Sequence, residues 1–283
     1  MSISALVADI GILALNKNRV QNACDAAALA GARELPDKGK AFSVAKSYAK
    51  TNGVDDSYVD VTFPESNKIT VTATDKPVDF FFARIMGINQ GFSNAHASAL
   101  VAPLSRVNGL VPFAVVDSAY TPDQTVVLKQ AGGDGTGGNY QAVDLDGLTG
   151  GTVYRDTIVS GCKTFYDVNQ TYTISTEPGA KNGPTRQGLE TRIGTDTCTI
   201  DTYESDLDCP RVVKVPLIQT LGALDVSGRA QITIKGFDYF FIESLSVEGG
   251  NLAVEGRFIK RAGDGDADPS QTSYGAKGVI LTE

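Results

Sequence analysis

The pattern of apolar and polar residues predicts one long helix over residues 1–33, which ends before Pro36 because proline cannot continue a helix. Residues 1–15 are apolar on every face of this helix except at three positions, Ser2, Ser4 and Asp9. From Asn16 onward, polar residues alternate with a narrow stripe of mostly small side chains: Val20, Cys24, Ala27, Ala28 and Gly31. Small side chains let helix backbones approach closely, so this second half is typical of a tightly packed helix.

The apolar start of the helix has three interpretations. A membrane span needs about 20 apolar residues, whereas the run here covers residues 1–15 and contains an acid. A signal peptide would begin with basic residues and end at a cleavage site, and neither is visible. The helix could bury its start among copies of itself in a bundle or filament. It could instead be the remnant of a membrane anchor, or an ordinary core helix.

Asp9 is the unusual residue of the apolar start. A carboxylate on an apolar helix is costly unless it has a partner. Its neighbours one turn away are Leu6 and Ala5 on one side and Ile12 and Leu13 on the other, and none can pair with it. We therefore expect a partner from elsewhere, such as an amine, Lys or Arg of a neighbouring chain, or a protonated state. A solvent-facing aspartate near a frayed helix end is the alternative.

The following residues predict a small α+β segment that ends near a junction at Pro103–Leu110. Residues 38–52 form an amphipathic helix, which Gly53 ends. Residues 58–63 and 68–75 alternate strictly and predict a hairpin, and residues 91–102 predict a third strand. Between them, residues 77–89 begin with a proline and end near Gly87, and we interpret them as a short helix. The lone histidine, His96, lies on the third strand and is interpreted as structural.

Residues 104–283 read as a β-rich module with Gly- and Asp-rich loops, so the whole chain belongs to the α+β class. The sequence predicts one short helix within residues 181–194. It predicts strands over residues 111–117, 125–129, 152–159, 170–176, 211–218, 227–236, 252–259 and 277–282. The predicted domains are residues 1–33, 34–103 and 104–283.

Charge and composition restrict the function. Among 283 residues, Asp and Glu number 33 and Lys and Arg 25, which gives a net charge of −8. Such a chain does not wrap nucleic acid by neutralising phosphates. One histidine and four cysteines leave little for a His- or Cys-based metal site. The glycine-rich stretch 132–138 lacks the Lys-Ser/Thr of a phosphate loop, and no nucleophile elbow is present, so we expect neither an enzyme nor a resident cofactor.

Calcium is the one ion that the sequence leaves open. Asp264, Asp266 and Asp268 alternate at a spacing found in calcium loops, but Gly275 stands where an EF-hand needs its last acid, so a solvated acidic loop is the alternative. Glu204, Asp206 and Asp208 form a weaker candidate of the same kind.

The cysteines predict one disulfide. Cys198 and Cys209 bracket an acidic loop with no other evident constraint, which a bridge would close. Cys24 packs well on the helix as a free thiol, and Cys162 remains unassigned, with a bridge to Cys24 or to one of the other two possible.

Two segments of the sequence resemble the TadE/TadG-like proteins of tight-adherence (Tad) pilus assembly. The first is ALVADIGILALNKNRVQNACDAAALAGARELP, with the family's Asp-x-Gly step at Asp9–Gly11 and Cys24 where the family usually has alanine. The second is VDFFFARIMGINQGFSNAHASALV, which is similar to the family's Phe-Phe-Ala-x-x-x-Gly segment followed by a strand. The typical pilin glutamate at the fifth position is absent, because Ala5 stands there, and Asp9 is a candidate for its pairing role.

The resemblance implies a pilin-like architecture: an assembly helix, a small α+β pilin-like domain and a β-rich surface domain. It also implies a structural subunit of an extracellular, cell-surface type IV-like filament, held in the inner membrane before assembly. Its partners would be further copies of itself and the Tad assembly machinery. The assembly residues expected on the helix are Leu6, Asp9, Ile10, Leu13, Val20 and Ala27. The alternatives are a membrane-anchored minor pilin or assembly factor, and a calcium- or glycan-binding adhesin module.

Overall fold

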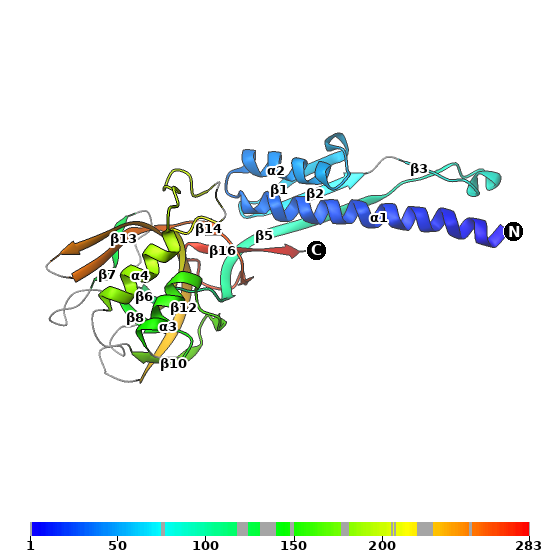
Figure 1. Cartoon of the computed structure of the whole chain (residues 1–283). Coiled ribbons are helices and arrows are strands. Elements are labelled where there is room, and N and C mark those ends of the chain that lie inside the picture. Colours follow the sequence, from blue (N-terminus) through cyan, green and yellow to red (C-terminus); the bar gives the residue numbers. More distant parts are fainter. Residues whose placement is uncertain are drawn as a thin grey trace. The chain divides into compact units, whose positions relative to one another are not determined.

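The computed structural model describes residues 2–74, 77–117, 124–130, 140–147, 150–176, 181–204, 206, 208–219, 229–248 and 251–282. The chain divides into two compact units (Figure 1). Residues 1–102 and 279–283 form the N-terminal unit, and residues 103–278 form the C-terminal unit. Strands β5 (Asn94–Val107) and β16 (Ala276–Thr282) pass from one unit to the other. The mixed α+β class predicted from the sequence is confirmed.

The N-terminal unit packs two helices on one sheet. Helix α1 covers Ser2–Arg33 and α2 covers Lys38–Thr51, where the side chain of Asp37 accepts a 2.9 Å hydrogen bond from the Lys40 N–H and caps α2. The sheet runs in the order β1 (Val59–Glu65), β2 (Lys68–Thr74), β5, β16, with the short helix η1 (Asp56–Tyr58) before β1. The predicted helix 38–52 and the strands near 58–63, 68–75 and 91–102 are confirmed.

The core of this unit consists mainly of alanine and valine. The second half of α1 contributes side chains that are completely buried: Val20, Ala23, Ala27, Ala28 and Ala32. Across from them lie Ala41, Ala45 and Ala49 of α2 and the inward-facing Ile69, Val71 and Ala73 of β2. Small residues let the two helices and the sheet approach closely. The second half of α1 is therefore part of the core of the N-terminal unit.

The segment before β5 forms a short hairpin instead of the predicted helix over residues 77–89. Strand β3 (Val78–Asp79) pairs antiparallel with β4 (Gln90–Gly91), and between them lies one 3-10 turn, η2 (Ala83–Met86). Gly87 ends η2 in the left-handed conformation, with φ of 81°. We call residues 78–91 the tip hairpin. Only four residues become helical because the flanking residues pair with each other across the hairpin.

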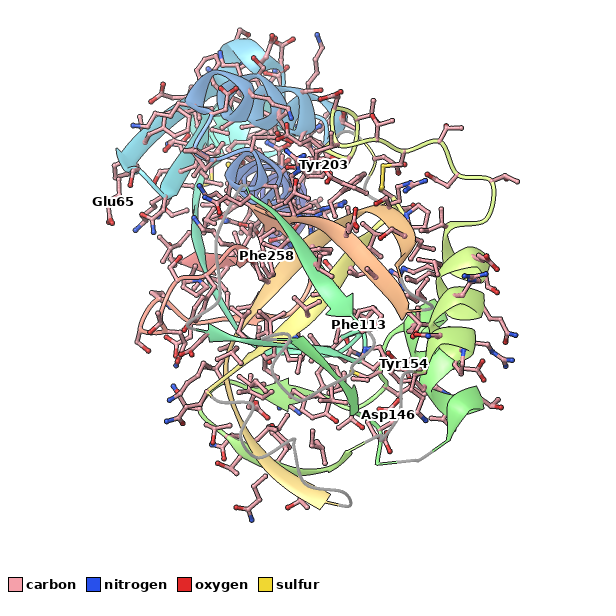
Figure 2. All side chains as sticks on the ribbon, turned by 90° about the vertical axis from the view of Figure 1, so that its left-hand side faces the viewer. Glu65, Phe113, Asp146, Tyr154, Tyr203 and Phe258 are labelled. Carbon is pink, nitrogen blue, oxygen red and sulfur yellow. A yellow bond between two sulfur atoms is a disulfide. The ribbon has the colours of Figure 1, made fainter. Side chains whose placement is uncertain are left out.

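The C-terminal unit is built on a second sheet of the order β10-β8-β6-β11-β12-β13-β7. These strands are β6 (Phe113–Val116), β7 (Thr125–Gln130), β8 (Tyr140–Asp144), β10 (Thr171–Thr176), β11 (Val212–Ile218), β12 (Arg229–Glu248) and β13 (Asn251–Ile259). Helices α3 (Gly151–Ser160) and α4 (Asn182–Ile193) contribute Tyr154, Ile158 and Leu189 to its core. Phe113 meets Tyr154 edge to face, and Phe240 meets Phe258 in the same way. Figure 2 labels Phe113, Tyr154 and Phe258.

Three short strands complete this unit: β9 (Tyr166–Asp167), β14 (Arg261–Ala262) and β15 (Asp266–Ala267). The predicted strand 152–159 is wrong, because α3 occupies this position. Its buried residues, Tyr154, Thr157 and Ile158, recur at helical spacing. The short helix expected within residues 181–194 is α4. The sequence also missed β8 and the second half of β12, while the glycine-rich stretch 132–138 lies outside the described residues.

Candidate assembly surface

The tip hairpin lies along the first half of α1 (Figure 1). A chain of polar contacts fastens the segment from the hairpin to β5 against one face of the helix. Asn16 donates a 3.2 Å hydrogen bond to Ser93, and Gln21 donates a 3.0 Å hydrogen bond to the carbonyl of His96. Gly91 of the tip hairpin lies beside Leu13 of α1. A Cβ at Gly91 would lie only 3.0 Å from the Leu13 side chain, so glycine permits the close approach of the strand to the helix.

Asp9 fastens the hairpin at its far end. One carboxylate oxygen accepts a 3.0 Å hydrogen bond from the Phe81 N–H. The other accepts hydrogen bonds of 2.9 Å from the Phe82 N–H and 2.8 Å from the Ala83 N–H. The residue is only 2% exposed. The partner is therefore three backbone amides of the same chain, which corrects both the expected intermolecular partner and the solvent-facing alternative.

The surroundings keep the carboxylate of Asp9 ionised. Burial raises its pKa, and the three backbone donors together outweigh that effect, so the pKa lies below the ordinary value of 3.8. An ionised oxygen is a stronger acceptor than a neutral one, which favours the docked hairpin. Asp9 thus acts as a latch between α1 and the tip hairpin.

Replacing Asp9 with asparagine is expected to loosen the hairpin without unfolding the N-terminal unit. An asparagine has one carbonyl oxygen, and its NH₂ group would face an N–H donor, so at least one of the three amides loses its acceptor. Hydrogen exchange at the amides of Phe81, Phe82 and Ala83 should accelerate on the order of tenfold. Exchange in β2 is the internal control and should not change.

Acidification should have the same effect in the parent chain. Because the folded-state pKa of Asp9 is lowered, its stabilising contribution is complete above the ordinary pKa and is lost as the pH falls through the lower, folded-state value. The protection factors at Phe81–Ala83, which divide out the intrinsic slowing of amide exchange in acid, should therefore decrease in acid in the parent. The Asp9→Asn chain should show no such step, and identical pH profiles for the two chains would contradict the latch.

The rest of the helix start is open to solvent. Val7 is 61% exposed, Ile10 59% and Leu15 72%, and Ile12 is also exposed. A helix turns about 100° per residue, so Val7, Gly11 and Ala14 lie on the opposite side from Asp9. Apart from the helix's own backbone and the two adjoining residues, no atom of the described residues lies within 4 Å of a Cβ built at Gly11. We call Val7, Ala8, Ile10, Gly11, Ala14 and Leu15 the outer helix face.

The tip hairpin exposes a second set of large apolar side chains. Phe81 is 74% exposed, Ile85 88% and Met86 73%. Phe82, Ile88 and Phe92 are also exposed. The only charged residue within residues 80–92 is Arg84, which lies 3.5 Å from Asp79. Contiguous exposed apolar residues of this kind mark an interaction surface, and we call the outer helix face and these hairpin residues together the apolar tip.

The assembly residues expected from the sequence fall into different environments. Ile10 is exposed, whereas Leu13 is half-buried beside Gly91. Val20 and Ala27 are completely buried in the unit's own core, so neither is free to contact another chain. The side chain of Leu6 lies outside the described residues. Sequence reasoning missed Phe81, Ile85 and Met86, although an apolar run too short to bury itself was a usable signal.

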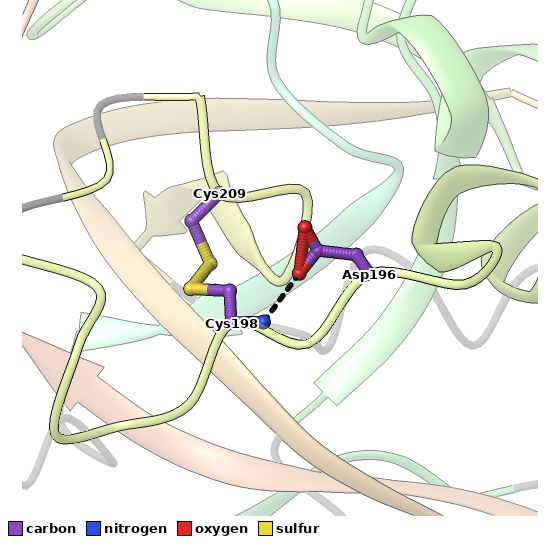
Figure 3. A group of neighbouring side chains, drawn as sticks. All are labelled: Asp196, Cys198 and Cys209. Atoms are coloured by element: carbon purple, nitrogen blue, oxygen red, sulfur yellow. Dashed lines mark hydrogen bonds between the residues drawn. A yellow bond between two sulfur atoms is a disulfide. The ribbon is translucent and has the colours of Figure 1, made fainter.

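The predicted disulfide between Cys198 and Cys209 is present, with Cα atoms 5.9 Å apart (Figure 3). It closes the acidic loop, and Tyr203 of that loop packs against Phe241 with ring centroids 5.9 Å apart. Asp196 lies beside the bridge and accepts a 2.6 Å hydrogen bond from the Cys198 N–H. Because the two sulfur atoms are bonded to each other, they are not thiolate ligands for a metal.

Cys24 and Cys162 are both free and buried. Burial raises the pKa of each thiol to about 11, so both stay protonated and unreactive at neutral pH. Cys162 is a free thiol and is not bridged to Cys24, Cys198 or Cys209.

The acidic stretch proposed for calcium has other partners. Asp268 accepts hydrogen bonds from the N–H and hydroxyl groups of Ser270 and from Gln271. Burial lowers the pKa of Lys214, and the negative charge of Asp264 partly offsets that effect. Among the described residues, neither these aspartates nor Glu204, Asp206 and Asp208 bring three ligand atoms within 4.8 Å of one another. The structure therefore does not gather the residues of the calcium hypothesis.

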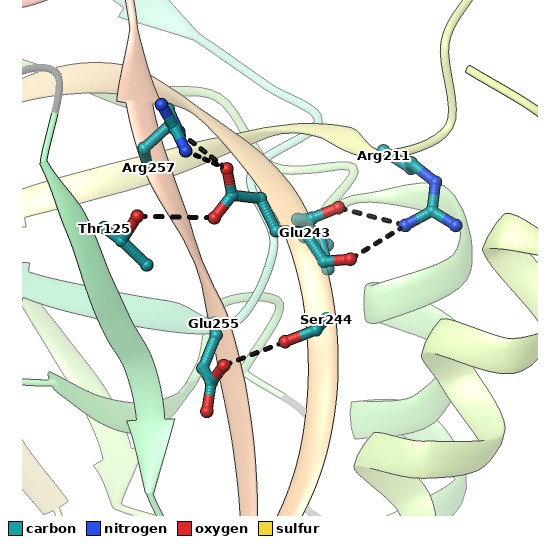
Figure 4. Close-up of polar contacts among 7 residues, drawn as sticks. Thr125, Arg211, Glu243, Ser244, Glu255 and Arg257 are labelled. Carbon is teal, nitrogen blue, oxygen red and sulfur yellow. Dashed lines mark hydrogen bonds and ion pairs between the residues drawn. The ribbon is translucent and has the colours of Figure 1, made fainter. Parts of the chain in front are cut away.

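A further group of polar contacts links strands of the C-terminal unit (Figure 4). Glu243 on β12 accepts a 2.7 Å hydrogen bond from Arg257 on β13 and a weaker one of 3.4 Å from Thr125 on β7. Arg211 donates to the carbonyls of Ile242 and Glu243, and Glu255 accepts a 2.9 Å hydrogen bond from Ser244. These contacts fix the register of the edge strands, and we assign them to stability.

Comparison with known protein families finds a match over the first helix. Residues 1–34 match the family described as putative Flp pilus-assembly TadE/G-like. The N-terminal helix is similar to a Tad pilus-assembly segment. The match covers α1, including the outer helix face and Asp9, and ends before α2. No curated protein and no solved structure matches the chain. Within the described residues, no helix carries an apolar stretch sufficient to cross a bilayer.

Proposed function

We propose that this protein is a structural subunit of a Tad-type surface filament and that it assembles through its apolar tip. The exposure of the outer helix face, on a helix similar to a Tad pilus-assembly segment, carries the proposal. Each large apolar side chain gains roughly 1.5–3 kcal/mol when it is fully buried, before the cost of association is subtracted. A helix face of such residues is therefore a strong driving force for contact with other chains. The proposed role is structural rather than catalytic.

The charge distribution also supports assembly through the N-terminal unit. Residues 1–102 hold as many basic as acidic side chains, so the acidic surplus of the whole chain, 33 against 25, lies in the remainder. Like charges on neighbouring copies repel, whereas a neutral apolar surface does not. Subunits would then pack through the N-terminal unit and expose the acidic C-terminal unit to solvent, at the outside of an extracellular filament.

Replacing Val7 and Ile10 together with serine is expected to remove the chain from filaments. Both side chains are exposed, so the melting temperature of the purified chain should change little. In the producing cells, the parent should be recovered in filaments sheared from the surface, and the variant should fall at least about tenfold there. Val247→Ser is the matched control, since Val247 is 52% exposed in the C-terminal unit.

Two results would contradict the filament role. Recovery of the Val7→Ser/Ile10→Ser chain in sheared filaments at the parental level would show that the outer helix face does not drive assembly. Recovery of the parent only in the cell membrane fraction, and never in filaments, would favour the assembly-factor or minor-pilin alternative.

A further inference from the structure

The apolar tip consists of two surfaces, one on the side of α1 away from Asp9 and one on the hairpin that covers the Asp9 side. The tip hairpin covers the side of α1 that carries Asp9 and Leu13. The outer helix face lies about half a turn away from that side. The exposed Phe81, Ile85 and Met86 therefore do not cover the exposed Val7 and Gly11 of their own helix. Each surface is left for another occupant.

The two surfaces differ in shape in a complementary way. The outer helix face has small residues, Ala8, Gly11 and Ala14, between the larger Val7, Ile10 and Leu15. Space around Gly11 is open, because nothing lies within 4 Å of a Cβ built there. The hairpin presents large side chains with high exposure. Large side chains of one element commonly insert between the ridges of a helix at positions where residues are small.

We propose that the tip hairpin of one copy docks on the outer helix face of the next copy, with Ile85 and its neighbours above Gly11. This inference rests on the proposed filament role and names the contact that builds the filament. A contact between two different surfaces is head-to-tail, and its repetition produces an open helical assembly instead of a closed dimer. Neither surface would bring an unpaired charge into a contact with a second copy. Asp9 is the only ionisable residue within residues 7–15, and Arg84 is the only one within residues 80–92. Asp9 is held by backbone amides of its own chain, and Arg84 pairs with Asp79.

Asp9 gains a role in this arrangement. It holds the hairpin in one position on α1, so that the hairpin of each copy is presented rigidly to the next helix. Asp9 is thus a positioning residue for assembly and does not itself cross the interface. The acid that the sequence suggested as an intermolecular partner acts within its own subunit.

The contact can be tested by cross-linking between two single-cysteine chains. Gly11→Cys chains and Ile85→Cys chains are produced together, and surface filaments are oxidised. A disulfide between the two new cysteines can form only between copies, since each chain carries one of them and Cys24 and Cys162 are buried. We expect a covalent dimer that joins the two positions in sheared filaments. Tyr48→Cys replaces Ile85→Cys in the control, because Tyr48 is exposed on α2, and should give no such dimer.

A second variant tests the close approach at the glycine. Gly11→Leu should not lower the melting temperature of the monomer, because the site is open and leucine favours a helix more than glycine does, but it should lower filament recovery at least about tenfold. Gly39→Leu on α2 is the matched control, where the nearest atom to a new Cβ is a side-chain oxygen of Asp37 at 3.4 Å. The Phe81→Ser/Ile85→Ser chain should lose filament recovery to the same extent as Gly11→Leu.

The outcomes separate this inference from the proposed function. If the parent forms filaments that require Val7 and Ile10, but Phe81→Ser/Ile85→Ser chains are incorporated normally and no Gly11–Ile85 cross-link forms, the hairpin contact is wrong and the filament role survives. If the parent never enters filaments, the proposed function is wrong, and the hairpin contact, which rests on it, is wrong as well. If the hairpin variants keep filament recovery but lose binding to phosphatidylcholine vesicles, the occupant of the hairpin is a lipid surface, which also overturns the proposal.

Discussion

Removing residues 1–33 is expected to unfold the N-terminal unit, whereas removing only residues 1–18 should leave it folded. The longer deletion takes away the buried Val20, Ala27 and Ala28, against which α2 and the sheet pack. A helix that supplies one side of a core contributes an amount comparable with the whole stability of a small domain, about 5–15 kcal/mol. The shorter deletion removes the outer helix face and the Asp9 latch but no residue of this core.

Hydrogen exchange read separately in the two units checks this prediction. In the chain without residues 1–33, protection of the amides in β1 and β2 should disappear, while β11 and β12 of the C-terminal unit stay protected. In the chain without residues 1–18, β1 and β2 should keep their protection, and only the tip hairpin should exchange faster. Retained protection of β2 in the longer deletion would show that the sheet does not need α1.

Local patterns sufficed to predict much of the N-terminal unit from the sequence. The small-residue stripe of α1 correctly indicated close helix packing, although its partner is α2 of the same chain. Strict alternation in residues 58–63 and 68–75 placed the hairpin of β1 and β2. The Cys198–Cys209 bridge followed from a short loop that had no other constraint. In each of these cases the signal and its partner lie close together in the sequence or repeat with a clear period.

The parts that the sequence did not predict depend on distant partners. Asp9 receives its donors from Phe81 and Ala83, which lie more than seventy residues away. No spacing rule relates an acid on a helix to backbone amides of a later loop. The predicted strand over residues 152–159 was wrong for another reason. Over so short a length, Val153, Tyr154, Thr157 and Ile158 suit both the helical and the strand period. Burial of α3 against α4 decides for the helix.

The two halves of the same helix therefore lie in different environments, which its sequence pattern only partly separates. Its second half is internal core, with Val20 and Ala27 enclosed by α2 and the sheet. In its first half, one side is covered by its own hairpin and another side is exposed. An all-round apolar helix start suggested contact with neighbours on every side. In the structure, the hairpin covers one side, so the outer helix face is the side left open for contact. The proposed contact between copies is therefore head-to-tail.

Gly31 and Gly11 lie on the same helix in opposite environments. A Cβ at Gly31 would lie 2.6 Å from Ile69, 3.0 Å from the carbonyl oxygen of Ala41 and 3.1 Å from Ala45. The site is thus closed by β2 on one side and by the backbone of α2 on the other. Gly11 has no neighbour within 4 Å of the same position.

Gly31→Leu is accordingly expected to destabilise the N-terminal unit by about 3 kcal/mol, because the added side chain must push α2 away from α1. Gly11→Ala should instead stabilise the monomer by up to about 1 kcal/mol, since alanine favours the helix and meets no atom there. Denaturant unfolding monitored by the exchange of β2 and α1 amides measures both values. The close packing of α1, α2 and β2 requires the two changes to differ in sign. Equal effects at the two glycines would mean that α1 is not held against α2 at Gly31, and the division of the helix into a core half and an assembly half would fail with it.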